Sequence, residues 1–153
     1  MSYWDKKLVR EQVDKKLLRL KALPEKPSVG WIKTLREALG MTAVQFGKRI
    51  GVRQSRITQI EKSEIEGNLK LATMEKIADG LGMKFVYGFV SQEGLEDIIR
   101  TQAKKLALQR MKTLDHTMRL ELQNLSPSEK EKAIEDMVDR ILIEGDKQLW
   151  EVI

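Results

Sequence analysis

The chain has 153 residues, of which 41% are hydrophobic and 33% charged, and it contains no cysteine. These proportions are typical of a folded globular protein, and the lack of cysteine excludes disulfide bonds and thiolate metal sites. The longest uncharged apolar stretch, residues 85–90, is far shorter than the ~20 residues of a membrane-spanning helix, and no apolar signal region follows Met1, so we expect a cytoplasmic protein without a membrane partner.

Charge is distributed unevenly around a net value of +5. Residues 1–27 carry a net charge of +4, residues 28–90 carry +4, and residues 91–153 carry −3. The basic residues 1–90 indicate a polyanionic partner, and the acidic residues 91–153 indicate a different role. The alternative is that helical surfaces are simply rich in Lys and Glu, and charge alone leaves both interpretations open.

The first predicted element is a basic amphipathic helix over residues 4–22, followed by a linker that Pro24 and Pro27 delimit, so that residues 1–27 form one segment. The apolar side of this helix is predicted to consist of Trp4, Leu8, Val13, Leu17 and Leu20.

A domain over residues 28–90 is predicted to follow. Its glycine-separated helices are expected at residues 31–38, 42–50, 53–62 and 71–80. Aromatic and β-branched residues then predict one short strand over residues 84–90.

Residues 91–153 predict a helical extension that forms a dimer or holds a partner. Residues 92–123 indicate one long helix or two joined helices. Ser126, Pro127 and Glu129 are typical of a capped helix start, and the helix that they open places Ile134 and Val138 on one face. The predicted fold class is therefore mainly all-α.

The most informative stretch is residues 42–61. Thr42 is expected to cap a helix, and Phe46 and Ile50 lie on one face of it. Gly47 is expected where that helix approaches its partner closely, and Gly51 where a sharp turn needs positive φ. The inner face of the next helix is predicted to contain Ile57 and Ile60.

This spacing is that of a DNA-reading helix-turn-helix. Apolar patterns over residues 31–40 and 71–82 flank it. Together these segments resemble the Xre-type helical domain of phage repressors.

The outward residues of the second helix have the chemistry of base recognition. Gln binds adenine, Arg binds guanine, and Ser and Thr bind bases or phosphates. The resemblance to phage repressors adds the positions that read base edges. We predict base contacts by Gln54, Ser55, Arg56 and Gln59, and DNA backbone contacts by Thr42, Lys48, Arg49, Arg53 and Thr58. The alternative is a helical hairpin that is kept for protein contacts.

A narrower resemblance covers nearly the whole chain. It is carried by Gly30-Trp31, the segment 85–90, residues 116–123 and the late Leu149-Trp150. The chain is similar in these features to the mobile mystery protein A family, whose members are encoded beside a Fic-domain protein. The resemblance implies an autorepressor and an antitoxin that restrains a Fic toxin.

The chain lacks the short motif that is commonly associated with Fic inhibition, Ser or Thr followed by three residues and Glu-Gly or Glu-Asn. Its Glu-Gly pairs at residues 66–67, 93–94 and 144–145 are preceded at the required position by Lys62, Phe89 and Arg140.

No residue set indicates an enzyme, a metal site or a cofactor. His116 is the single histidine, and the carboxylates of residues 129–144 have the spacing of a solvated helix face. We expect a sequence-specific repressor that binds operator DNA as a homodimer. Two alternatives remain open. One is a partner-binding protein with a vestigial helix-turn-helix, and the other is a non-specific nucleic-acid binder.

Overall fold

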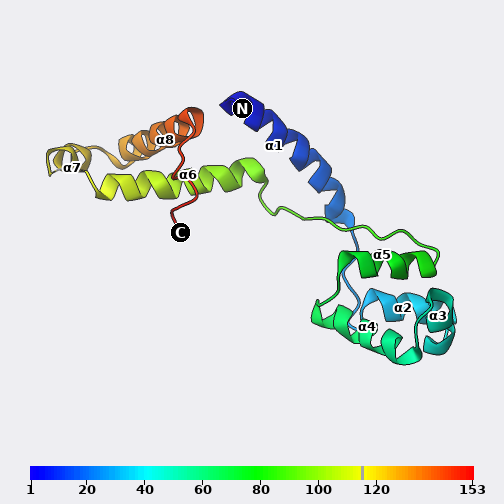
Figure 1. The fold of residues 1–153 in the computed structure, drawn as a ribbon. Coiled ribbons are helices and arrows are strands. Elements are labelled where there is room, and N and C mark those ends of the chain that lie inside the picture. Colours follow the sequence, from blue (N-terminus) through cyan, green and yellow to red (C-terminus); the bar gives the residue numbers. More distant parts are fainter. Residues whose placement is uncertain (115) are drawn as a thin grey trace. The chain divides into compact units, whose positions relative to one another are not determined.

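The computed structural model describes residues 1–114 and 116–153 of the chain. These residues form two compact units (Figure 1). One is the contiguous segment Leu23–Gly88, and the other combines Met1–Ala22 with Phe89–Ile153. Residues 1–22 thus share a unit with the C-terminal region, and the functional division at residues 27 and 90 stays a prediction.

Helices make up the regular structure of the described residues, and none of these helices is long and apolar enough to cross a membrane. Their bounds are α1 Tyr3–Leu18, the 3-10 helix η1 Arg19–Ala22, α2 Trp31–Ala38, α3 Ala43–Ile50, α4 Gln54–Glu66, α5 Leu71–Gly80, α6 Leu95–Lys112, α7 His116–Gln123 and α8 Pro127–Glu144.

Helices α2 to α5 close around one apolar core (Figure 1). The predicted bounds of α2 and α5 are confirmed, and α4 continues four residues beyond its predicted end. The core consists of Ile32, Phe46, Ile57, Ile60, Ile77 and Leu81. Because three of these side chains come from α3 and α4, this core fixes the geometry of the predicted helix-turn-helix.

The predicted strand at residues 84–90 is wrong. No described residue of this segment has strand structure or makes a backbone hydrogen bond within the described chain. The β-preference of aromatic and branched side chains reflects packing on a neighbouring strand, and the structure offers no such neighbour among the described residues. Phe85 and Val86 instead face α2 and α5.

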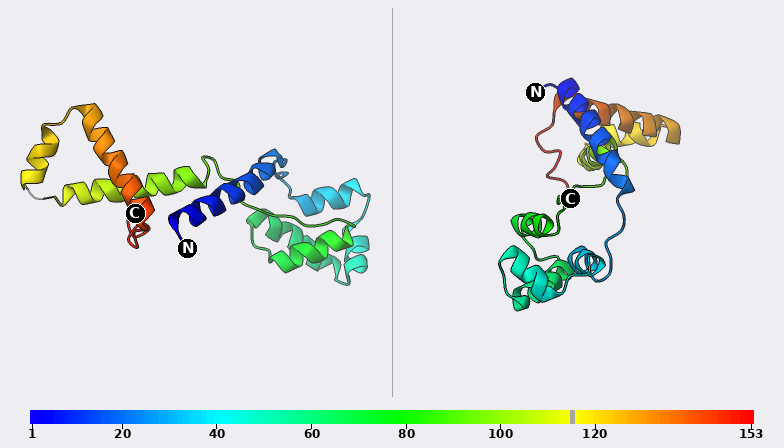
Figure 2. Two further views of the ribbon diagram at one scale, coloured as in Figure 1. Left: turned by 90° about the horizontal axis from the view of Figure 1, so that it is seen from above. Right: turned by 90° about the vertical axis from the view of Figure 1, so that its right-hand side faces the viewer.

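The second unit is built on the pairing of α6 with α8, and α7 stands at the end of this pair (Figure 2). The structure therefore resolves the two alternatives for residues 92–123 in favour of two helices. Ser126 caps α8 with Pro127 at the first helical position, as predicted. The core contains Ala103, Leu106, Ala107, Val138, Ile141, Leu142 and Leu149.

Helix α1 lies against α6 and α8 with a face that includes only part of the predicted apolar side. At about 100° per residue, Trp4 and Leu8 point to the side opposite Val13 and Leu17. Trp4 is 67% exposed, and the half-buried stripe of α1 mixes the apolar Val13 and Leu17 with the polar Lys7, Arg10 and Asp14. The prediction of one shared apolar side is wrong, because it placed residues from two helix faces together.

Candidate nucleic-acid interface

Backbone contacts around two glycines fix the turn between α3 and α4. Gly51 ends α3 with φ of 77°, a conformation that glycine adopts without steric cost. The amide of Val52 then donates to the carbonyl oxygen of Gly47 at 2.8 Å. A Cβ at Gly47 would lie 2.6 Å from the Val52 carbonyl oxygen, so a larger residue would push the turn away. The predicted roles of both glycines are confirmed.

Thr42 begins α3 with a complete capping box. Its hydroxyl accepts a hydrogen bond from the Gln45 amide at 3.1 Å, and the Gln45 side chain accepts one from the Thr42 amide at 2.8 Å. The predicted capping role is confirmed. The exposed hydroxyl keeps its own hydrogen for donation, so the predicted contact with the DNA backbone remains compatible with the cap.

Helix α4 is anchored by its buried face. Ile57 is fully buried and Ile60 is 3% exposed, which confirms the predicted inner face. Beside them, the Nε of Arg36 on α2 donates to the Glu61 carboxylate at 2.6 Å, and this hydrogen bond raises the pKa of Arg36. The same guanidinium donates to the carbonyl of Met41. These contacts hold α4 in one rotation about its axis.

Glu64 adds a second link between α4 and α2. Its carboxylate accepts the backbone N–H groups of Trp31 and Ile32 at 2.8 and 2.9 Å, so it caps α2 from another helix. Arg36 and Glu64 were not predicted as residues that support the position of α4. The available signal was a charged residue on a buried stripe, because Arg36 follows Ile32 by four residues and Glu64 follows Ile60 by four.

All nine predicted DNA-contacting residues are exposed. Arg53 is the N-cap residue of α4, and among the described residues its side chain makes no capping hydrogen bond. Between Arg53 and Ile60 the exposed face contains no acidic residue. The structure therefore brings together on α4 and its N-cap the group Arg53, Gln54, Ser55, Arg56, Thr58 and Gln59, while Thr42, Lys48 and Arg49 belong to α3 and its cap.

Five of the nine predicted DNA-contacting side chains already take part in hydrogen bonds, one of them being Thr42 in its capping box. Arg56 Nη1 donates to Gln59 Oε1 at 3.0 Å, and the Thr58 hydroxyl donates to the carbonyl of Gln54 at 3.3 Å. Arg49 Nε donates to the carbonyl of Gly80 at 2.6 Å, which ties α3 to the end of α5. Arg49 therefore has a structural contact, and its remaining N–H groups are those available to a phosphate.

Comparison with known protein families agrees with this geometry. Residues 32–87 match a family model described as helix-turn-helix. The matched segment is a helix-turn-helix domain. Its family is one of DNA-binding regulators, which supports DNA binding and transcription regulation as the general role of the domain. No curated protein and no solved structure matches the chain.

The matched domain contains every residue that was assigned to DNA from the sequence, and α4 is the second helix of the pair that α3, the turn and α4 form. In a helix-turn-helix motif the second helix enters the major groove, and the first crosses the DNA backbone. The base and phosphate contacts of individual residues remain predictions.

Proposed function

We propose that the chain is a sequence-specific transcriptional regulator that reads operator DNA with the exposed face of α4. One observation carries the proposal. Because Ile57 and Ile60 are buried, the opposite face of α4 is exposed. This face has two arginines and two glutamines, and it has no acidic residue between Arg53 and Ile60. That combination suits a surface that approaches a polyanion and then distinguishes its bases.

The base-reading set is Gln54, Ser55, Arg56 and Gln59. A glutamine reads adenine by accepting from N6 and donating to N7. The hydrogen bond from Arg56 to Gln59 Oε1 assists this, because it orients the Gln59 amide and leaves the second lone pair of the oxygen for the base. Arg56 then retains further donors for a neighbouring guanine or phosphate.

Phosphate contacts are assigned to Thr42, Lys48, Arg49, Arg53 and Thr58. Lys48 and Arg49 lie in the last turn of α3, and Arg53 lies at the start of α4. These side chains fix the position of α4 in the groove without reading sequence.

The active form is a homodimer. One helix-turn-helix covers only a half-site, and two copies about 34 Å apart on a palindrome give usable specificity. Large exposed apolar side chains outside the helix-turn-helix domain support self-association, among them Trp4, Leu8 and Trp150. Sedimentation analysis of the full chain at micromolar concentration is expected to give twice the monomer mass, and a monomer at every concentration would contradict this part.

The regulator also acts as an autorepressor and as the antitoxin of a Fic-domain toxin. The resemblance to the mobile mystery protein A family supports this role. Because the chain has no Ser/Thr-x₃-Glu-Gly motif, restraint of the toxin would use other contacts. Co-purification of the chain with a Fic protein encoded beside it is expected, and independent elution of the two would remove this part of the proposal.

The central test is a titration of fluorescent duplexes at two salt concentrations. The full chain is expected to prefer its own upstream DNA to a scrambled duplex by ~10³-fold. Gln54→Ala combined with Gln59→Ala should remove most of that preference. Lys48→Ala should weaken binding to both duplexes by a similar factor and reduce the salt dependence.

The matched control is Gln109→Ala, which removes an exposed glutamine from α6 and should leave both affinities unchanged. Equal binding of the unmodified chain to both duplexes would overturn sequence-specific regulation. Preference that survives in the Gln54/Gln59 variant would show that the helix-turn-helix is not the reader.

A further inference from the structure

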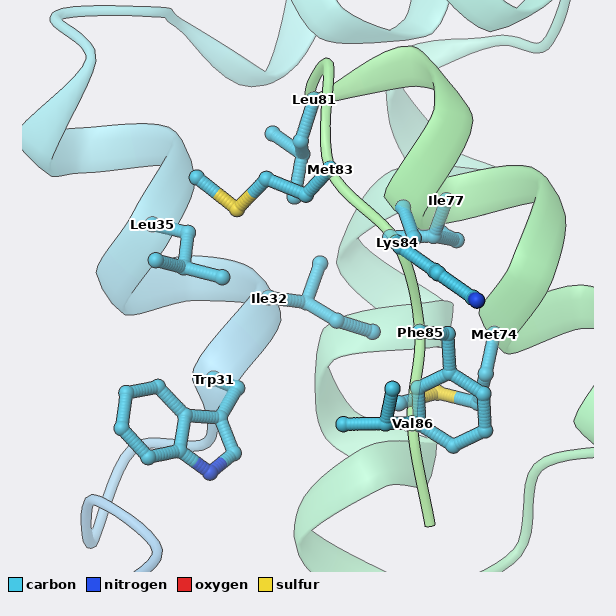
Figure 3. Close-up of a pocket in the computed structure, with 11 residues that line it drawn as sticks. Trp31, Ile32, Leu35, Met74, Ile77, Leu81, Met83, Lys84, Phe85 and Val86 are labelled. Carbon is cyan, nitrogen blue, oxygen red and sulfur yellow. The ribbon is translucent and has the colours of Figure 1, made fainter. Parts of the chain in front are cut away.

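The helix-turn-helix domain contains an apolar pocket on a part of its surface that the proposed DNA contacts do not use. The pocket has a volume of about 220 Å³. Ile32 and Leu35 of α2 and Met74 and Ile77 of α5 line it, and Phe85 and Val86 lie over it (Figure 3). None of the nine residues assigned to DNA lines this pocket.

The size of the pocket suits a small organic molecule. An engineered apolar cavity of ~150 Å³ is large enough to bind benzene. A pocket of about 220 Å³ therefore has room for one aromatic ring with a short side chain. Its floor is rigid, because Ile32 and Ile77 are each 2% exposed and belong to the core of the domain.

The polar side-chain groups around the pocket are all hydrogen-bond donors. The lining side chains provide two N–H donors, the ammonium of Lys84 and the indole of Trp31, and no oxygen acceptor (Figure 3). Lys84 is exposed and makes no hydrogen bond or ion pair with the residues that the structure describes. A ligand head group that only accepts hydrogen bonds and carries negative charge would complement this rim.

The segment over the pocket is held weakly. The amide of Met83 donates to the carbonyl of Ala78 at 2.8 Å, but no described backbone hydrogen bond holds residues 84–86. Their side chains are the contacts that keep the segment on α2 and α5, and Val86 is 60% exposed. The segment can shift to admit a ligand without breaking backbone hydrogen bonds.

We propose that this pocket binds a small amphipathic carboxylic acid, with its apolar body on Ile32 and Ile77 and its carboxylate on Lys84. This site is separate from the proposed DNA-reading face, so its test does not depend on DNA binding.

The test uses three probes that share one apolar body: 3-phenylpropionate, 3-phenylpropanol and 3-phenylpropylamine. The ¹⁵N-labelled full chain is titrated with each, and the Trp31 indole and the amides of residues 83–86 are followed by NMR. We expect 3-phenylpropionate to bind about tenfold more tightly than the alcohol, since a charge-assisted hydrogen bond contributes roughly that factor, and the amine to bind most weakly. The indoles of Trp4 and Trp150 should not shift.

Lys84→Gln should remove the preference for the acid over the alcohol while the alcohol still binds. Lys70→Gln is the matched control, because Lys70 is exposed in the same unit and does not line the pocket. Ala78→Leu, which puts a larger side chain on the pocket wall, should weaken all three probes. Equal affinity for acid and alcohol, an unchanged preference in Lys84→Gln, or no shift of Trp31 at about 10 mM acid would each overturn the proposal.

Discussion

Each of the two units contains a helix whose N-terminal cap comes from a carboxylate on another helix. In the helix-turn-helix unit, α2 follows Gly30 at φ of 83°, and Glu64 of α4 accepts its first amides. In the other unit, α6 follows Gly94 at φ of 91°, and Asp14 of α1 accepts the amide of Leu95 at 3.0 Å. Neither helix has a capping side chain at its own N-cap position.

The two caps differ in burial and in reach. Glu64 is 7% exposed, bonds to two amides and lies 33 residues from Trp31 in the sequence. Asp14 is partly exposed, bonds to one amide and is 81 residues away from it. A second polar contact, the 2.8 Å ion pair between Arg10 and Glu96, joins the same two helices as Asp14. Capping by a carboxylate of another helix is therefore part of the core in the helix-turn-helix unit. In the other unit, it links segments that are distant in the sequence.

Removing a central core side chain should have the largest effect and would test whether the units are independent. Phe46 is fully buried, so Phe46→Ala is expected to destabilise the helix-turn-helix unit by about 3–5 kcal/mol. Hydrogen exchange should accelerate throughout α2 to α5, with α6 and α8 still protected. Leu106→Ala is the counterpart and should affect the other unit alone. Equal loss of protection in both units by either variant would contradict independence.

Removing the buried cap should have the next largest effect. Glu64→Ala leaves two helix-start amides without their acceptor and is expected to lower the free energy of unfolding of its unit by about 2–3 kcal/mol. Glu64→Gln should lower the free energy of unfolding by roughly half as much. Its amide oxygen still accepts one backbone N–H, but its NH₂ group faces the second N–H. Thermal denaturation of the three proteins measures the difference. A glutamine variant as unstable as the alanine variant would show that the charge, rather than the acceptor oxygens, matters.

Removing the partly exposed cap should have a smaller effect. Asp14→Ala is expected to cost about 1 kcal/mol, the usual value of an N-cap side chain. Exchange should accelerate at the start of α6 and along α1, and α2 to α5 should keep their protection. Exposed Asp97, in the first turn of α6, provides the control Asp97→Ala. If Asp14→Ala lowered the free energy of unfolding as much as Glu64→Ala does, the proposed difference between the partly exposed cap and the buried cap would be wrong.

The smallest effect on stability is expected when low pH protonates Asp146. The pKa of Asp146 is lowered from its ordinary value of 3.8 by the backbone N–H of Gln148 and by Arg110. A lowered folded-state pKa means that this carboxylate stabilises its unit above the ordinary value and that the contribution is lost as pH falls through the lowered one. NMR titration of the Asp146 carboxyl carbon should give a midpoint below 3.8. Arg110→Gln should raise that midpoint only partly, since the backbone hydrogen bond remains.

The helix-turn-helix unit was largely predictable because its signals are local. The glycine spacing at Gly47 and Gly51, the cap at Thr42 and the inward Ile57 all act within a few residues of one another. The exposed face of α4 followed directly, because residues that do not point inward on a short helix must face solvent or a ligand.

What the sequence did not reveal depends on partners that are distant along the chain. Glu64 and Asp14 are ordinary acids until folding places a helix N-terminus beside them. The segment 84–90 has the composition of a strand, but composition cannot supply the neighbouring strand that pairing requires. Of the predicted apolar side of α1, Trp4 and Leu8 are exposed, and the half-buried stripe combines Val13 and Leu17 with Arg10 and Asp14, which bond to α6 and its first amide.

The discontinuous unit also determines an order of events during synthesis. Translation proceeds from the N-terminus, and contiguous domains fold as they are completed. The segment Leu23–Gly88 is complete once Gly88 has been made, whereas α1 must wait for α6, which begins at Leu95, and for α8, which ends at Glu144. The helix-turn-helix domain is thus expected to fold on the ribosome while α1, which is made before it, is still without the helices that it packs against.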